Sequence, residues 1–78
     1  MPVFYFHIRN GQELVLDREG VQMPGLEAAL EEAKSAAREI LAERIRHGDV
    51  VDGHEFEVHD AAGAKLFTLP FRSVIRLE

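Results

Sequence analysis

The sequence predicts an α+β fold with the order ββαββ: a four-stranded, antiparallel-rich sheet with one long helix packed on one face. Two segments in which apolar and polar residues alternate precede the helix, and two more follow it. Between them, apolar residues recur at three- and four-residue steps, which is typical of an amphipathic helix. With 78 residues, of which 46% are hydrophobic, we expect one domain over residues 1–78.

The first hairpin is predicted over residues 3–9 and 13–16. Residues of its first strand alternate between two faces. The apolar set on the core face is Phe4, Phe6 and Ile8, and the set on the outer face is Tyr5, His7 and Arg9. Asn10 and Gly11 tolerate the positive φ that tight hairpin loops require. A second turn is predicted at residues 17–20, because Asp17 and Gly20 occupy its first and fourth positions.

The helix is predicted from Leu26 to about His47. Pro24 suits a first helical turn, and Gly48 fits the left-handed residue that follows a helix end. We expect the core to combine the apolar helix face with the inner faces of the strands: Phe4, Phe6, Ile8, Leu30, Ala33, Ala37, Phe56, Val58 and Phe67.

The last two strands are predicted over residues 55–59 and 65–71, joined by a turn at residues 60–63. Pro70 cannot donate to a ladder, so the last strand ends there or lies at an edge at that point. Residues 73–78 fit either a short strand or a frayed helical turn. The first and last strands are the most apolar, so we place them centrally; numbered along the chain, the order is 2-1-4-3, with 2-1-3-4 as the alternative.

Composition excludes several classes of protein. The chain has no cysteine, so disulfides, thiolate metal sites and cysteine nucleophiles are excluded. The formal net charge of -5 argues against the nucleic-acid backbone as the main partner. No segment has the length and hydropathy of a membrane span, and no signal peptide is evident, so we expect a cytoplasmic protein without a membrane partner.

Histidines are the first candidates for chemistry, at positions 7, 47, 54 and 59. A zinc site needs three or four convergent ligands. His54 and His59 point to opposite faces if they share a strand. His7 and His59 share the outer face if their strands are close, with Glu55 or Glu57 nearby. Because only two imidazoles converge, we expect solvated or hydrogen-bonded histidines, and neither a metal nor a cofactor.

Catalysis and nucleic-acid binding are the alternatives to a binding module. Glu55 and Glu57 share one strand face, but one helix on one sheet offers little depth for an active site. Tyr5 is the one aromatic residue of its strand left on the outer face, and the carboxylates around it oppose phosphate. We therefore expect no enzyme, and regard a nucleic-acid-binding regulator as the runner-up and a shallow His/Glu-site enzyme as the weaker alternative.

A set of positions along the whole chain resembles a known family: Pro2, Tyr5-Phe6-His7, Gly11, Asp17, Gly20, Leu26-Glu27-Ala28-Ala29, Phe56-Glu57-Val58, Asp60, Gly63 and Leu69-Pro70-Phe71. It is a family of short uncharacterised bacterial proteins, a domain of unknown function common in rhizobia-like alphaproteobacteria. Val3 departs from the basic residue that typically follows the proline. The resemblance implies a small single-domain bacterial protein without an assigned activity, and no site residue can be carried over.

The expected function is therefore a non-enzymatic protein-interaction module that forms a homodimer, or binds another protein. A helix of this length is longer than the strands, so its end should overhang the sheet and expose apolar residues. Val3, Tyr5, Val15 and Leu66 should add apolar area to the outer sheet face. The competing arrangement is a diagonal helix whose end is covered by the C-terminal residues. The candidate interaction surface comprises Ile40, Leu41, Ile45, Tyr5, His7 and His59.

Overall fold

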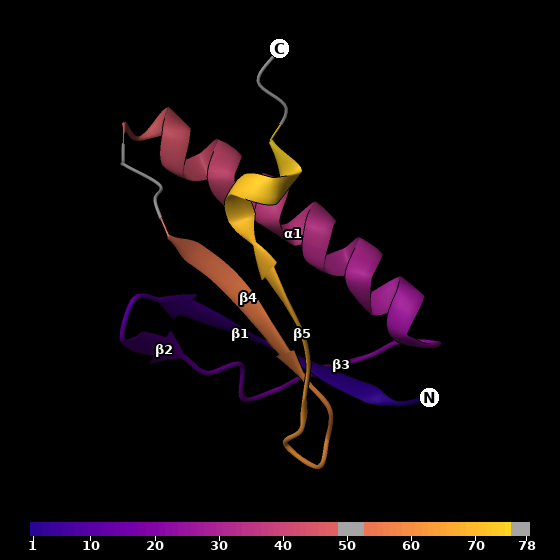
Figure 1. Cartoon of the computed structure of the whole chain (residues 1–78). Coiled ribbons are helices and arrows are strands. Elements are labelled where there is room, and N and C mark those ends of the chain that lie inside the picture. Colours follow the sequence, from indigo (N-terminus) through magenta and orange to yellow (C-terminus); the bar gives the residue numbers. More distant parts are fainter. Residues whose placement is uncertain (49–52, 76–78) are drawn as a thin grey trace.

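The computed structural model describes residues 1–48 and 53–75, whose strands form one twisted antiparallel sheet with a helix on one face (Figure 1). The elements in chain order are β1 (Val3–Asn10), β2 (Glu13–Val15), β3 (Val21–Gln22), α1 (Leu26–Arg46), β4 (His54–His59), β5 (Lys65–Pro70) and the 3₁₀ helix η1 (Phe71–Val74). The predicted α+β fold is confirmed. The two-residue β3 is an addition to the expected strands.

The order of the strands is β2-β1-β4-β5, and β3 also pairs with β1. The order 2-1-4-3 is therefore wrong, and the alternative 2-1-3-4 is correct. Hydropathy was misleading because β4 carries Glu57 and His59 on its outer face, where side chains of β1 contact them. β5 forms the edge of the sheet and ends at Pro70. Because Pro70 lies on an edge strand, its missing N–H interrupts no hydrogen-bond ladder in the interior of the sheet. A bulge shifts the β4–β5 register between Val58 and His59.

Helix α1 begins at Leu26 and ends at Arg46, close to the predicted bounds. Gly25 precedes it in an extended conformation without a side-chain cap, so Pro24 lies outside the helix rather than in its first turn. Gly48 has a φ of 77° and donates its N–H to the Ile45 carbonyl at 3.0 Å. The predicted left-handed residue after the helix end is thus confirmed.

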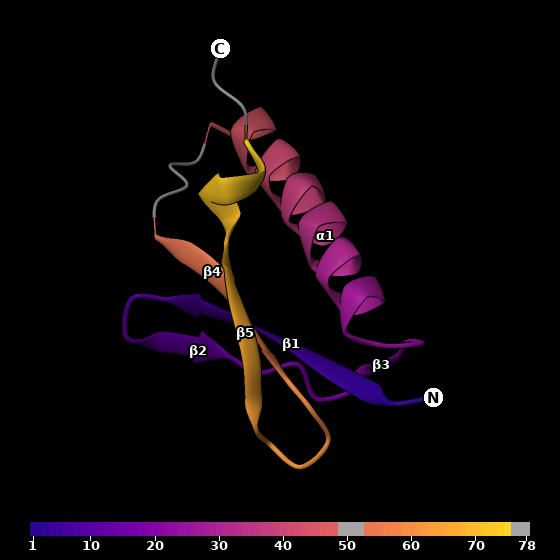
Figure 2. The same cartoon turned by 45° about the vertical axis from the view of Figure 1, so that its right-hand side comes forward.

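The core lies between α1 and one face of the sheet, and neither α1 nor η1 covers the other face (Figure 2). The helix contributes a stripe of alanines, Ala29, Ala33 and Ala37, that are fully buried and let its backbone approach the sheet closely. Five of the nine expected core residues are buried. The other four pack at the margin of the core and are partly buried: Phe6, Ile8, Leu30 and Phe67.

The C-terminal η1 turn closes the core at the end of α1. Phe71 is buried and packs against Phe56, with ring centroids 4.8 Å apart. Leu41, which we expected on an exposed helix end, is only 3% exposed, because η1 packs against α1 (Figure 1). Of the residues 73–78 for which two alternatives were open, 73 and 74 take the helical form as the end of η1, which also includes Phe71, expected at the end of the last strand. Residues 76–78 and the connection at 49–52 lie outside the described residues.

The short β2 changes the expected position of one apolar side chain. Val15 pairs in register with Ile8, a residue of the core face, so the expectation that Val15 lies on the outer face is wrong. Val15 is 61% exposed, because the helix does not extend over β2. Leu14 instead pairs with Arg9 on the outer face.

Candidate functional site

The uncovered face of the sheet carries a cluster of aromatic, basic and acidic side chains on its two central strands. The β1–β4 register pairs Tyr5 with His59 and His7 with Glu57, and cross-strand partners share a face. Arg9 follows on the same face of β1. We name Tyr5, His7, Arg9, Glu57 and His59 the outer-face cluster. The convergence of His7 and His59, conditional in the sequence, is confirmed by ring centroids 4.7 Å apart.

An ion pair across the two strands fixes one end of the cluster. Arg9 donates its Nε–H to Glu57 Oε2 at 2.7 Å, and Glu57 is only 8% exposed. This hydrogen bond lowers the pKa of the Glu57 carboxyl, against the effect of desolvation, and it raises the pKa of Arg9. Both groups therefore stay charged over the pH range of ordinary assays.

Asp17, in the turn after β2, fixes the other end. Its backbone N–H donates to His7 Nδ1 at 2.9 Å, and its Oδ2 accepts the Phe6 N–H at 3.0 Å. Its Oδ1 accepts the N–H groups of Glu19 and Gly20, both at 3.2 Å. Partial burial by itself would raise the pKa of the Asp17 carboxyl, but these three backbone donors and the nearby His7 together hold it below its ordinary value.

The hydrogen bonds assign different protonation patterns to the two histidines. His7 Nδ1 accepts an amide N–H, so neutral His7 carries its proton on Nε2. Burial, and then the neighbouring His59, lower the pKa of His7, with Asp17 and Glu57 acting in the opposite direction. His59 Nδ1 lies 3.2 Å from the Gly63 carbonyl oxygen, which can only accept, so neutral His59 carries its proton on Nδ1.

This pattern decides which ring nitrogens could hold a metal. A ligating histidine offers one lone pair and donates its other N–H to an acceptor. His59 fits that description, with a buried Nε2 that lies 3.7 Å from Glu57 Oε1. His7 does not, because its free Nε2 carries the proton. Among residues 1–48 and 53–75, no group of three or more histidine or acidic side chains is arranged to hold an ion.

The remaining histidines lie apart from the cluster. His47 Nε2 contacts Glu43 Oε1 at 3.0 Å at the end of α1. His54 faces the core side and stacks on Phe71 with ring centroids 6.0 Å apart, so it points away from His59 as predicted. Its Nδ1 is buried without a hydrogen-bond partner among the described residues.

The expected apolar patch at the end of α1 is reduced by η1. Leu41 is part of the core, and Ile40 packs against the core with partial burial. Ile45 remains 63% exposed. Of the six candidate interaction residues, the structure therefore brings together Tyr5, His7 and His59 on the outer face and leaves Ile45 separate from them.

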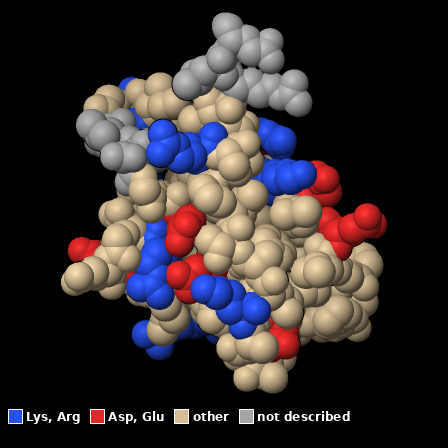
Figure 3. Space-filling view, viewed as in Figure 1, with Lys and Arg blue, Asp and Glu red and all other residues tan. Residues whose placement is uncertain are grey.

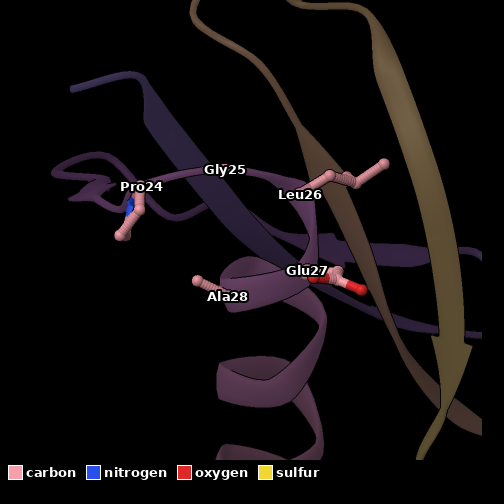
Figure 4. Close-up of a pocket in the computed structure, with 5 residues that line it drawn as sticks. All are labelled: Pro24, Gly25, Leu26, Glu27 and Ala28. Carbon is pink, nitrogen blue, oxygen red and sulfur yellow. The ribbon is translucent and has the colours of Figure 1, made fainter.

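A shallow hollow lies at the start of α1, away from the cluster. Five consecutive residues line it: Pro24, Gly25, Leu26, Glu27 and Ala28. Figure 4 shows Leu26 and Glu27 pointing to one side and Pro24 and Ala28 to the other. These side chains do not converge on a common point, so the hollow lacks the focused polar groups of a ligand site.

Sequence reasoning missed two parts of the cluster. Asp17 was interpreted only as a turn residue, although it also holds His7 and the backbone of β1. Its spacing of three residues from Gly20 predicted the turn, but no sequence pattern indicated the contact with His7. The pairing of Arg9 with Glu57 depends on the β1–β4 register over 48 residues of separation, and a sequence pattern does not give that register.

Comparison with known proteins identifies a family. No curated protein and no solved structure shows significant similarity to the chain. No helix of the described residues is long and apolar enough to cross a membrane. The family model for a domain of unknown function, DUF6894, matches residues 3–72, which is most of the chain. The chain therefore belongs to the DUF6894 family.

Proposed function

We propose that this chain is a small, non-enzymatic protein-interaction module of the bacterial cytoplasm, and that the outer-face cluster is its binding surface. One observation carries the proposal. The cluster consists of buried and half-buried side chains that are fixed by hydrogen bonds and ring contacts on a sheet face that neither α1 nor η1 covers (Figure 1). A surface ordered before binding loses little side-chain entropy when a partner docks.

The bonding state of the cluster supports binding rather than catalysis. A general base needs an accessible lone pair within reach of its substrate. The His7 Nδ1 lone pair accepts the Asp17 N–H, and His59 Nε2 is buried. Glu57 is engaged by Arg9 and is buried. The lone pairs of these three side chains are thus engaged or buried, so the cluster offers shape and charge to a partner rather than an accessible general base.

The partner that we propose is a second copy of the chain. In the middle of the visible face, charges of both signs lie side by side (Figure 3). Arg9 and Lys65 share this face with Glu55 and Glu57. A two-fold axis repeats each charge on the opposite subunit, so a face of mixed sign can complement itself.

Sedimentation equilibrium from about 5 to 100 μM at pH 7.5 tests the proposal. We expect the mass to rise from one chain toward two. Lys65→Glu replaces an exposed cation of the outer face, and we expect it to weaken association roughly tenfold or more. Ile45→Glu, at the exposed end of α1, serves as the matched surface control and should have no effect.

The outcomes separate the candidate surfaces. A mass of one chain at every concentration would refute the homodimer. A dimer that Ile45→Glu disrupts and Lys65→Glu preserves would place the interface at the end of α1, and would refute the outer-face cluster as the binding surface.

A nucleic-acid-binding regulator is the second candidate, favoured by one feature of the cluster. Tyr5, His7 and His59 form a continuous series of rings on the central strands, and such rings can stack on unpaired bases. The net charge of -5 and the mixed signs of Figure 3 oppose it. Fluorescence anisotropy with a labelled single-stranded oligonucleotide at low salt distinguishes the two. Binding that Tyr5→Ala abolishes and Tyr5→Phe retains would favour this candidate.

A further inference from the structure

The turn at residues 17–20 completes an edge of β1 that strands leave open. β2 pairs with residues 8–10 of β1, and β3 pairs with residues 3–4. Between these two pairings, the Phe6 N–H has no strand partner on this edge. The Asp17 carboxylate accepts it at 3.0 Å. A side chain therefore takes the place of a strand in the middle of β1.

Two contacts hold this turn against the outer-face cluster. The first is the hydrogen bond from the Asp17 N–H to His7 Nδ1 at 2.9 Å. The second is close packing of Gly20, where an added Cβ would lie 2.7 Å from Val3 Cγ1 and 2.9 Å from Tyr5 Cε2. The turn thus rests on Tyr5 and His7, two members of the cluster.

The first contact depends on the protonation of His7. An amide N–H can only donate, so His7 Nδ1 must offer a lone pair. In the imidazolium form both ring nitrogens carry a proton, and two N–H groups would then face each other. The carboxylate of the turn that could accept a hydrogen bond from the new N–H is Asp17, which already holds three backbone N–H groups of the turn and β1. The two N–H groups must separate, or the Asp17 carboxylate must release backbone N–H groups to bind protonated His7. Both changes move the turn from its position.

We propose that His7 and Asp17 form a proton-controlled latch, in which neutral His7 holds the turn at residues 17–20 against β1 and protonated His7 displaces it. The charged and titratable groups that face His7 come from the turn, from β4 and from β1 itself: Asp17, Glu57, His59, Tyr5 and Arg9. Burial and His59 disfavour the proton on His7, whereas Asp17 and Glu57 favour it.

The latch also regulates the proposed binding surface, and this part of the inference rests on the proposed function. Tyr5 and His7 keep their positions in the cluster while the turn is closed over the edge of β1. Displacing the turn disorders that side of the cluster. Association through the outer face is therefore strong at neutral pH and weak when His7 is protonated.

A proton–nitrogen NMR titration from about pH 8 to pH 5 tests the latch itself. We expect the amide signals of Phe6 and Asp17 to shift together with the ring signals of His7, with one shared midpoint below 6.5. The Asp17 carboxyl titrates far below this range, so it does not contribute. The amide of Val58, in the core of β4, reports any loss of the fold.

Two variants make the titration specific. In His7→Asn the side-chain oxygen takes the place of Nδ1 as an acceptor that does not titrate, so we expect flat Phe6 and Asp17 signals. His59→Asn removes the neighbouring ring but leaves the latch, so the titration should persist. The latch is overturned if the wild-type amides do not follow the His7 ring, or if His7→Asn titrates like the wild type. Should His7→Asn fail to fold, the wild-type titration alone decides.

Sedimentation of the same proteins at pH 7.5 and pH 5.5 tests the regulation. We expect wild-type association to be measurably weaker at pH 5.5 than at pH 7.5, and His7→Asn to associate equally at both. Equal wild-type association at both pH values, with amides that titrate, would overturn the regulation and leave the latch. Absence of association at both pH values would refute the proposed function, and the NMR titration would still decide the latch.

Discussion

Gly20 offers the most direct test of how the turn after β2 packs on the sheet, through the substitution Gly20→Ala. Its φ of +72° lies in the left-handed region, which costs a residue with a Cβ about 1–2 kcal/mol. The new Cβ would also lie 2.7 Å from Val3 Cγ1 and 2.9 Å from Tyr5 Cε2. Carbon atoms prefer separations of about 3.5–4.0 Å, so β1 and the turn must part by roughly 1 Å.

Overpacking of this kind typically costs a further 1–3 kcal/mol or so. We therefore expect Gly20→Ala to lower the free energy of unfolding by about 2–5 kcal/mol. A domain of 78 residues is expected to have roughly 4–12 kcal/mol in total, so the variant loses a large part of its stability. Urea denaturation followed by circular dichroism measures this loss as a lower midpoint with an unchanged slope.

Gly11→Ala and Gly48→Ala are matched controls for Gly20→Ala. Both glycines have a positive φ, +64° and +77°, but an added Cβ at either position meets nothing within 4 Å. These variants should show the backbone cost alone, about 1–2 kcal/mol. A Gly20→Ala variant no less stable than the two controls would show that the turn does not rest on Val3 and Tyr5.

The other predictions concern the core, the helix end and acid stability. Phe71→Ala should destabilise by about 3–5 kcal/mol in urea denaturation, and by more than Phe6→Ala, because Phe6 is only partly buried; the reverse order would contradict the role of η1 in closing the core. Gly48→Val should cost about 1 kcal/mol or more in the same assay, and an unchanged midpoint would mean that the helix ends differently. Because folding lowers the pKa of the Asp17 carboxyl, its contribution to stability is complete above its unfolded pKa and is lost as pH falls through the folded value. Thermal melts from pH 5 to pH 2 should show this loss, and Asp17→Asn should lose less stability over the same range, keeping only the part that comes from groups such as Glu57.

The sequence predicted the elements well because their signals are local. Alternation placed Phe4 and Tyr5 on opposite faces of β1, and helical periodicity located α1 to within a residue or two. The order of the strands was not predictable by hydropathy, because Glu57 and His59 made a central strand look peripheral. Their polarity is compensated by Arg9 and by other groups that only the register brings near.

The candidate site shows the same division between local and long-range information. The shared face of Tyr5 and His7 follows from their spacing, and His59 joined them once the β1–β4 pairing was known. Leu41 was misplaced because a long helix was expected to overhang the sheet, whereas the 3₁₀ turn that begins at Phe71 covers its end. A short turn of this kind carries no periodic signal, so its position could not be derived beforehand.

The pairing of β1 with β4 has a consequence for when the binding surface exists during folding. Arg9 and Glu57 are 48 residues apart, and the whole of α1 lies between their strands. Joining them closes a large loop, a step that is entropically costlier than forming the neighbouring β1–β2 hairpin. A nascent or truncated chain that ends within α1 contains Tyr5, His7 and Arg9 but lacks their partners on β4. A partner that recognises the complete cluster, such as the second copy proposed above, therefore binds only chains that include β4.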